Sequence, residues 1–291
     1  MQETLIGRGR EAVGWVLDAG TFNENTAGGR EFDPAYGPGA VVGTGLLKGR
    51  EVVVLANDAQ AVNDRFPVVY FGVIGLEEAY KMAEVVYTVM EADRGKTPAE
   101  KTPLVLIVDT PGNAPGKVEE IVGMNKATGA YQLALAQARQ EGHPIVAIVI
   151  GRAISGAFLC HGLQADRILA MAKEFGTKIH VMPITSISRI TKLDVERLEE
   201  LSTDNPVFAA GVDFFYQLGG VEEIIPSVEM IPERVADQII QVIKCKESGR
   251  LEDVGPLGRA ALGQKRGGRV WRQQVIDRMR AEFDEIREQY V

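Results

Sequence analysis

The chain has 291 residues, of which 45% are hydrophobic, 25% charged and 7% aromatic. These proportions are typical of a globular protein and exclude the disordered and fibrous classes. With 32 Lys and Arg against 40 Asp and Glu, the formal net charge is -8, which is the wrong sign for a dedicated nucleic-acid-binding protein. Two cysteines and three histidines are too few for a disulfide framework or a metal cage, so we expect a reducing, cytoplasmic location and no bound metal.

The start of the chain and its glycine content set two further expectations. Arg8, Arg10 and Glu11 interrupt the first apolar residues, so no signal-peptide core is expected there, and no window reaches the roughly 18 apolar residues of a membrane span. The 32 glycines are about 11% of the chain, against a usual share of roughly 7%. We therefore expect unusually many close backbone approaches or left-handed turns.

The N-terminal third predicts an arm followed by the start of a sheet. After a short opening helix, residues 19–39 are rich in Gly, Asn and Pro and predict an irregular arm that packs on the core or on a partner. Two β-branched runs on either side of Gly49 predict a β-hairpin in which Gly49 takes a positive φ. Residues 74–93 have apolar side chains at three- and four-residue spacing, which predicts an amphipathic helix.

Two continuously apolar runs form the centre of the sequence. Residues 103–110, which are continuously apolar for six residues, and residues 145–150 read as strands buried on both faces, and each is followed by a glycine turn. One long helix is expected over 117–140, with Ile121 at the start of its apolar stripe, and further strands are expected over 165–172 and 177–182. Strands that alternate with helices predict parallel βαβ units.

The C-terminal third predicts helices and one linker. Residues 184–217 read as helical with a break at Asn205 and Pro206, and a helix covers 231–244. Residues 246–268 read as a polar, glycine-dotted linker. The last helix places six apolar residues on one face, which either folds back or docks on another subunit: Trp271, Val275, Met279, Phe283, Ile286 and Tyr290.

The two glycine turns are the strongest candidate for a functional site. They read DTPGNAPG over 109–116 and GRAISGAF over 151–158, and each follows a buried strand. The carboxyl ends of parallel strands meet at one edge of a sheet, so we expect the two turns to lie side by side. Gly112 and Gly156 let a ligand approach the backbone, and the NH groups that follow them are donors suited to a developing oxyanion.

Other interpretations of these turns are weaker. Either glycine could serve packing alone, and neither turn has the phosphate-binding patterns G-x-G-x-x-G or G-K-[ST]. Ser155 and His161 suggest nucleophilic catalysis, but their six-residue spacing turns them in different directions on a helix. Cys160 stands in an apolar run and is expected to be a buried small hydrophobic residue.

From about Val41 to Ile225 the sequence resembles the carboxyltransferase subunits of the crotonase-like superfamily, and within them the malonate decarboxylase gamma subunits. The most specific stretches are GHPIVAIVIGRAISGAFLCHGLQADRILAM over 142–171 and HVMPITSISRITKLDVERLEEL over 180–201. The resemblance implies an α/β fold, a crotonase-like spiral of ββα units with a helical C-terminal tail. We accordingly divide the chain into an N-terminal helix and arm (1–39), a carboxyltransferase domain (40–245) and a linker with an amphipathic helix (246–291).

The resemblance also implies a reaction and its partners. In that family a beta subunit of the same fold pairs with the gamma subunit, and the site between them removes the carboxyl group of a malonyl thioester on acyl carrier protein through an enolate. By position, the Gly156 and Ala157 peptide corresponds to the family's oxyanion pocket, and Gly112 and Asn113 lie beside it. The thioester arm of the carrier protein is of the phosphopantetheine type.

Biotin dependence stays open at this point. Biotin-type members of the family commonly begin with a segment like WVLDAGTFNEN, which stands here at 15–25 and favours a biotin-linked system. The chain has no Met-Lys-Met attachment site, so no cofactor is expected on it covalently, and any biotin would be on a separate carrier protein.

Three further expectations concern substrate contacts. Arg152, Arg189 and Lys192 are expected near the mouth of the site, where they would meet a carboxylate or the carrier-protein phosphate, and Ser155 is expected to contact substrate. Glu119 and Glu120 are expected to be solvated or to be charges at a helix N-terminus.

Three alternative activities stay in view beside malonate decarboxylation. One is the carboxyltransferase subunit of a biotin-dependent acyl-CoA carboxylase or decarboxylase, and another is a non-catalytic assembly scaffold. An acyl-CoA hydratase or isomerase would need a glutamate in the pocket, such as Glu119 or Glu120. The second glycine turn also resembles that of a serine peptidase of the same superfamily, whose nucleophile stands one residue earlier, at the position of Ile154 here. A shift by one residue turns Ser155 away by roughly 100 degrees, so peptidase activity is improbable.

Overall fold

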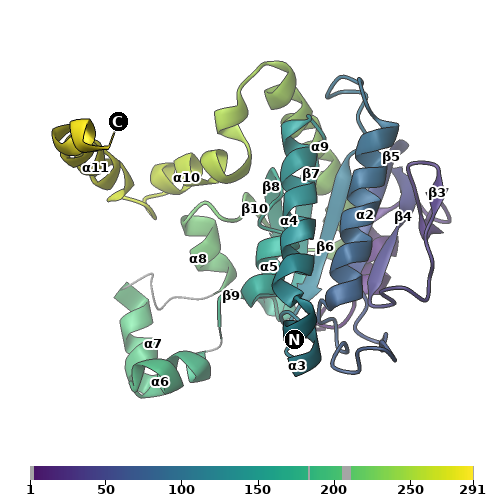
Figure 1. The fold of residues 1–291 in the computed structure, drawn as a ribbon, viewed down its shortest axis with the longest axis horizontal. Coiled ribbons are helices and arrows are strands. Elements are labelled where there is room, and N and C mark those ends of the chain that lie inside the picture. The colour runs from purple at the N-terminus through teal and green to yellow at the C-terminus, as the bar shows by residue number, and fades with distance from the viewer. Residues whose placement is uncertain (1–2, 183, 205–210, 291) are drawn as a thin grey trace.

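The computed structural model describes residues 3–182, 184–204 and 211–290. In this part of the chain an eight-stranded sheet lies between two layers of helices (Figure 1). The strands are β1 (Asn23–Glu24), β2 (Thr26–Ala27), β3 (Arg30–Glu31), β4 (Ala40–Leu47), β5 (Arg50–Asn57), β6 (Leu104–Thr110), β7 (Ile145–Ile154), β8 (Arg167–Met171), β9 (Lys178–His180) and β10 (Glu223–Ile225). The helices are α1 (Gly9–Val16), α2 (Leu76–Ala92), α3 (Lys117–Val122), α4 (Met124–Gln140), α5 (Ser155–Cys160), α6 (Ile184–Thr191), α7 (Val195–Asp204), α8 (Val212–Gln217), α9 (Ile231–Glu247), α10 (Gly255–Lys265) and α11 (Arg272–Ile286).

The sheet combines an antiparallel edge with a parallel centre. Its strand order is β1-β4-β5-β6-β7-β8-β10, with β9 paired to β7, while β2 and β3 form a separate two-stranded sheet. The pairing of β4 with β5 is antiparallel and ends at Leu47 and Arg50, so the predicted hairpin is confirmed. The strands from β5 to β8 and β10 run parallel, which confirms the predicted βαβ units.

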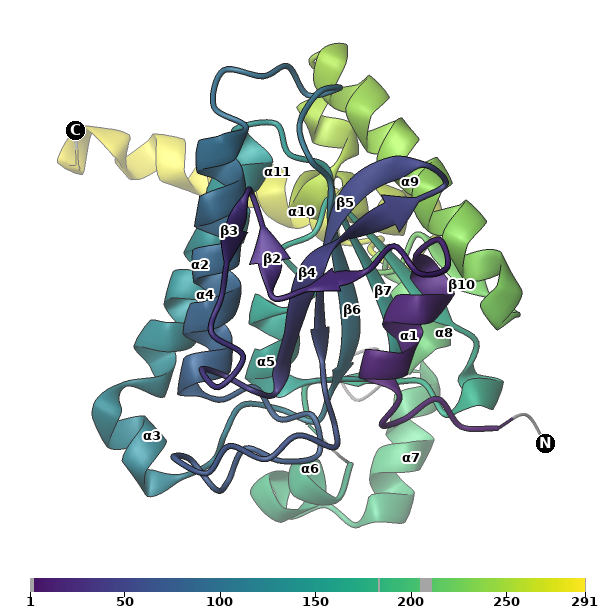
Figure 2. The ribbon, with the colours of Figure 1, turned by 90° about the vertical axis from the view of Figure 1, so that its right-hand side faces the viewer.

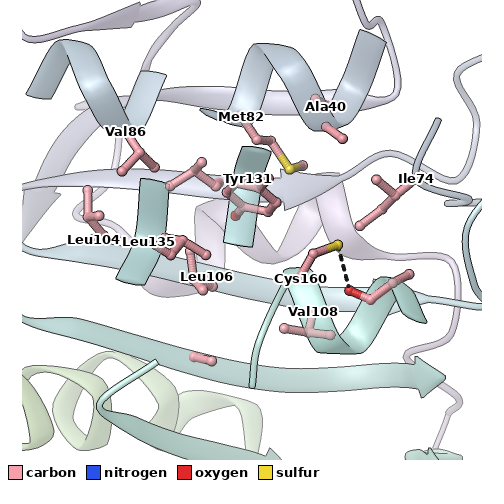
Figure 3. Packing of buried hydrophobic residues seen from close by; sticks show 14 of the residues in the cluster. Ala40, Ile74, Met82, Val86, Leu104, Leu106, Val108, Tyr131, Leu135 and Cys160 are labelled. Carbon is pink, nitrogen blue, oxygen red and sulfur yellow. Dashed lines mark hydrogen bonds between the residues drawn. The ribbon is translucent and has the colours of Figure 1, made fainter. Parts of the chain in front are cut away.

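Both faces of the parallel strands are buried, as their continuous apolar sequence predicts. In β6, Leu104, Leu106 and Val108 face the cluster formed with α2 and α4, whereas the alternate residues Val105 and Ile107 face α1 and α9. Figure 3 shows the first of these clusters, in which Tyr131 and Met82 lie over the strand. This alternation follows from the two-residue period of a strand.

The helix predicted over 117–140 is divided in two. Gly123 has a φ of 121°, a left-handed value that ends α3 and begins α4. Because the axis changes there, Ile121 does not continue the apolar stripe of α4 and is exposed. Glycine at this position permits a backbone angle that other residues rarely adopt.

Three sequence-based expectations need correction or addition. The arm over 19–39 is not wholly irregular, since it contains β1, β2 and β3 and places Ala27 and Phe32 in the core. Strand β10 was not predicted. The interpretation of 246–268 as a linker is wrong over Gly255–Lys265, which form α10. The predicted break at Asn205 and Pro206 lies outside the described residues.

Close packing explains why α10 is a helix despite its glycines. Gly263 approaches the carbonyl of Leu218, where a Cβ would clash with the backbone, so this glycine is a contact point between segments. The buried Arg259 side chain donates to the carbonyls of Ala165 at 2.6 Å and Leu163 at 2.7 Å. Burial lowers the pKa of Arg259 to about 10, and the group stays charged at neutral pH.

The C-terminal helix α11 extends away from the sheet beyond α10 (Figure 1). None of its residues is buried, and all six apolar residues predicted on one face are exposed. The interpretation as a docking helix therefore stays a prediction. No helix in the described part of the chain is long and apolar enough to cross a membrane.

A buried ion pair closes the end of the sheet opposite the glycine turns. Lys246 Nζ lies 2.9 Å from Asp166 Oδ2, and both side chains are almost fully buried. We expect Asp166→Asn to lower the free energy of unfolding by about 3–5 kcal/mol, because it leaves the Lys246 charge without its partner. Urea denaturation measures this. Asp213→Asn is the control: it removes the pair with Lys173, in which both side chains are exposed and screened by solvent, so its loss should be much smaller. Equal losses for both variants would contradict the expectation.

Candidate active site

The two glycine turns lie side by side, as the sequence predicts. They follow β6 and β7, which are neighbouring parallel strands whose pairing reaches Thr110 and Ala153 at this end. Figure 2 shows β6 running toward the side of the molecule on which α3, α6 and α7 lie. The site therefore forms at the carboxyl edge of the sheet, where open parallel sheets place their ligands.

Gly156 and Asn113 meet across the two turns. A Cβ on Gly156 would lie 2.9 Å from Asn113 Nδ2, so only glycine leaves that side chain its place. Asn113 Oδ1 is buried and has no hydrogen-bond partner among the described residues. The two turns thus meet at these residues, and the Asn113 side chain, which the sequence analysis did not consider, lies against Gly156.

The first turn is held by the segment before α2. Ile74 donates to the carbonyl of Gly112 at 3.1 Å and accepts from Ala114 at 2.9 Å. These two bonds leave the Asn113 amide without an acceptor among the described residues. The Gly112 amide is close to Thr110 Oγ1 at 3.4 Å, which is a long contact. Asn113 is therefore the freer of the two predicted donors in this turn.

The second turn has a strained start. Ile154 is extended, and Ser155 then takes a φ of 57°, a left-handed value that is uncommon for a residue with a side chain. The turn directs the chain abruptly from β7 into α5, where the amides of Gly156 and Ala157 stand in the first turn without helical acceptors. Such strain concentrates at functional sites.

Ser155 has no base beside it. His161 is fully buried, with Nδ1 2.9 Å from the Tyr131 hydroxyl and Nε2 2.9 Å from the carbonyl of Ile107. Since a carbonyl only accepts, Nε2 carries the proton and Nδ1 accepts from Tyr131. Both ring nitrogens are occupied away from Ser155, which is consistent with the rejection of a Ser-His nucleophile.

Cys160 is buried, as predicted from its apolar surroundings. Its thiol donates to the carbonyl of Ala157 at 3.2 Å, the contact drawn in Figure 3. Burial raises the pKa of Cys160 to about 12, so the thiol is neutral at physiological pH. It contributes packing under the turn and no nucleophile.

The predicted cations differ in their surroundings. Arg152 is buried and bound to Asp109, at 2.9 Å between Nε and Oδ1, so it does not share the surface with the exposed Arg189 and Lys192. Arg189 lies in α6, in which no residue is buried. Glu119 is buried beside Gly116 at the start of α3, whereas Glu120 is exposed, so only the latter is solvated.

The sequence analysis treated Asp109 only as the first residue of a turn and missed its ion pair with Arg152. An acidic residue ending one buried strand and a basic residue near the end of its neighbour are a recognisable signal, because buried charges require partners. The apolar runs before Asp109 and Arg152 carry that signal in this chain.

The comparison with protein families decides the assignment. The model of the malonate decarboxylase gamma subunit matches residues 71–283, which include both turns. The chain belongs to this family. A protein of Malonomonas rubra, malonyl-S-ACP:biotin-protein carboxyltransferase MADD, is 58% identical over 288 residues and covers 99% of each chain. The resemblance inferred from the sequence is confirmed. As a member of the gamma-subunit family, the chain is a subunit of an enzyme.

Solved structures confirm the crotonase-like fold. A Pseudomonas malonate decarboxylase hetero-tetramer in complex with coenzyme A matches with a TM-score of 0.71 and 29% identity, over 94% of this chain and 99% of that one. Transcarboxylase 12S matches with a TM-score of 0.61 and 19% identity, over 81% of this chain and 40% of that one, and shows the fold alone. A Mycobacterium tuberculosis biotin-dependent acetyl-/propionyl-coenzyme A carboxylase beta6 subunit is 27% identical over 74% of this chain, which spans 42% of that subunit.

We expect the free energy of unfolding to fall as the pH drops from 7 to 5. Burial lowers the pKa of His161 from 6.5 to about 4, so the unfolded chain binds the proton first, and the stability that the neutral ring contributes is lost progressively as the pH falls from about 6.5 to about 4. The free energy of unfolding should fall by about 2 kcal/mol between pH 7 and pH 5, and by roughly 3 kcal/mol once the pH is below both pKa values. Burial also lowers the pKa of His143, which adds in the same direction.

Urea denaturation at the two pH values measures the loss. His161→Gln removes the titrating group, and the difference between pH 7 and pH 5 should shrink in this variant without vanishing. Equal stability of the unaltered protein at both values would contradict the assignment of a neutral, buried His161.

Proposed function

We propose that this chain, paired with a beta subunit, removes the carboxyl group of malonyl-S-acyl carrier protein and leaves acetyl-S-acyl carrier protein. The observation that carries the proposal is the 58% identity over 288 residues to the Malonomonas rubra enzyme, whose name specifies malonyl-S-ACP and a biotin protein. The two buried free cysteines fit the cytoplasmic location that we propose. The catalytic domain over 40–245 stays part of this proposal.

The chemistry needs donors more than it needs a nucleophile. When the bond between the α-carbon and the carboxylate breaks, its electron pair enters the thioester as an enolate, and a proton later takes the place of the carboxyl group on carbon. The amides of Gly156 and Ala157 are proposed to donate to the enolate oxygen, with Asn113 beside them. One preorganised donor of this kind typically contributes on the order of a hundredfold or more in rate.

We propose that the carboxyl group passes to biotin on a separate carrier protein. When bound, biotin supplies a ureido nitrogen that accepts the carboxyl group. A ureido ring carries a carbonyl beside N–H groups, and the phosphopantetheine arm of acyl carrier protein carries amides. Within the described residues, Asn113 offers one unpaired acceptor, Oδ1, and one unpaired donor, its backbone amide, so it fits ligands that carry both N–H and carbonyl groups.

The beta subunit is proposed to cover the edge of the site. Exposed apolar side chains gather on α3 and on the segment before α2, which meet where Val68 lies 3.0 Å from the Cβ position of Gly116. These exposed residues are Tyr70, Phe71, Val118, Ile121 and Val122. A solved Pseudomonas MdcD-MdcE hetero-dimer, 31% identical with a TM-score of 0.64, supports pairing of this kind.

The test follows the labelled carboxyl group of malonyl carrier protein mixed with this chain, its beta partner and a biotin carrier. We expect the label to move onto the biotin carrier and avidin to stop this transfer. Release of labelled carbon dioxide that is indifferent to avidin would mark a direct decarboxylase, and label that stays on malonyl carrier protein would overturn the proposed function. Gly156→Ala is expected to slow the loss of label from malonyl carrier protein by about 10²-fold, because its Cβ meets Asn113 Nδ2 at 2.9 Å and disturbs the donor geometry.

The matched control is Gly129→Ala in α4, where a Cβ meets nothing within 4 Å. This variant should retain full activity and gain about 0.5–1 kcal/mol in stability. If Gly156→Ala and Gly129→Ala turn over alike, the chain acts as a scaffold and the chemistry belongs to its partner.

The exposed Arg189 is proposed to meet the acidic carrier protein or its phosphate, and Ser155, which is also exposed, to contact substrate. We expect Arg189→Glu to raise KM for malonyl carrier protein about tenfold at low salt and to leave kcat within twofold, since charge reversal acts on encounter. Steady-state kinetics at two salt concentrations measure this. An unchanged KM would remove Arg189 from the docking surface.

A further inference from the structure

An ion pair is buried directly beneath the two glycine turns. Asp109 in β6 is 1% exposed and Arg152 in β7 is 5% exposed. Their contact is double, with Nε 2.9 Å from Oδ1 and Nη2 3.1 Å from Oδ2. Apolar residues of similar size often stabilise a protein as well as a buried ion pair does, so stability alone does not account for these two residues.

The Asp109 carboxylate fills an irregularity between the two strands. Pairing passes from Val108 and Val149 to Thr110 and Ala153, so one residue of β6 stands against three of β7. Asp109 Oδ1 lies against two of these three residues of β7. It accepts from the Arg152 amide at 2.8 Å and lies 2.5 Å from the Cβ position of Gly151. The carboxylate thus sets where β7 resumes pairing, two residues before the strained Ser155.

The same pair fastens two further segments to the sheet. Asp109 Oδ2 accepts from the Gly7 amide at 2.6 Å. Arg152 Nη2 donates to the carbonyl of Phe71 at 2.9 Å, and the guanidinium carbon lies 4.1 Å from the centre of the Phe71 ring. Three residues after Phe71, Ile74 holds the first glycine turn through its two backbone bonds. One ion pair therefore touches the supports of both turns.

We propose that Asp109 and Arg152 are positioning residues, which hold the two glycine turns at the separation that enolate stabilisation requires, and that Arg152 is not a substrate ligand. This inference rests on the proposed function. Arg152 Nη1 has no hydrogen-bond partner among the described residues, but it is buried. Because Asp109 compensates the charge and Phe71 lies against the guanidinium, Arg152 offers no accessible cation to a carboxylate. Donor geometry matters steeply, since a displacement of about 1 Å can cost on the order of 10²-fold in rate.

The test compares Asp109→Asn, Arg152→Lys and the double variant in the complex with the beta subunit. Asparagine keeps the shape but brings an NH₂ group against the donors of Gly7 or Arg152, and lysine keeps the charge but cannot bind both Asp109 and Phe71. Both single variants should lower kcat about 10–100-fold, with KM for malonyl carrier protein within about twofold. The kcat of the double variant should fall no further than that of the more impaired single variant, because both substitutions act through one contact.

Two controls separate positioning from instability. Asp166→Asn disrupts an equally buried pair with Lys246 at the opposite end of the sheet and should leave kcat per folded complex unchanged. If Asp109→Asn does not fold, Gly151→Ala replaces it, because its Cβ would push on Asp109 Oδ1 without changing a charge. The near-ultraviolet circular dichroism spectrum reports whether each complex is folded.

Each outcome is decisive. A KM that rises tenfold or more in Arg152→Lys while kcat holds would make Arg152 a substrate ligand and overturn the inference. Full activity of Asp109→Asn, measured where the unaltered complex is active, would also overturn the inference. So would a loss of kcat in Asp166→Asn equal to that in Asp109→Asn. If the unaltered complex leaves the label on malonyl carrier protein, the proposed function fails and the positioning role fails with it.

Discussion

The rest of the structure depends on covering both faces of a parallel sheet. Leu104, Leu106 and Val108 face one helical layer and Val105 and Ile107 the other, so the strands themselves have no surface left for chemistry. Parallel strands also finish at a common edge, and the backbone there must turn before each covering helix begins. The reactive part of the molecule is therefore built from turns, and its precision comes from the strands beneath them.

Much of this arrangement can be predicted from the sequence, because it follows from local periodicity. The hairpin at Gly49, the two buried strands and the pairing of their turns all come from short apolar patterns that have one physical solution. Glycine is harder to interpret. Gly123 ends a helix and Gly263 is a contact point, yet in a sequence both resemble flexible residues, and only the tertiary packing distinguishes them.

The candidate site, like the fold, could be predicted in part from the sequence. The turns with Gly112 and Gly156 were expected side by side from the parallel direction of their strands, and the resemblance set Asn113 beside Gly156; in the structure the Asn113 side chain lies against Gly156. The sequence carries a signal for the pairing of Arg152 with Asp109, but not for the other contacts of Arg152, because these depend on an irregular register between β6 and β7 and on a loop carbonyl at Phe71. A charged residue near a site suggests a ligand contact until its partners are known, and here the nearest partner is another buried charge.

The tail helix α11 has a consequence for how the subunit is made. The apolar side chains of α11 and of the residues flanking it, from Trp271 to Tyr290, are exposed in the single chain, and proteins rarely leave a continuous apolar face uncovered. If another subunit covers this face, as predicted, copies made in excess of that subunit would tend to associate with one another. Balanced production of the two, such as translation from one shared message, would then keep the face covered as soon as it forms.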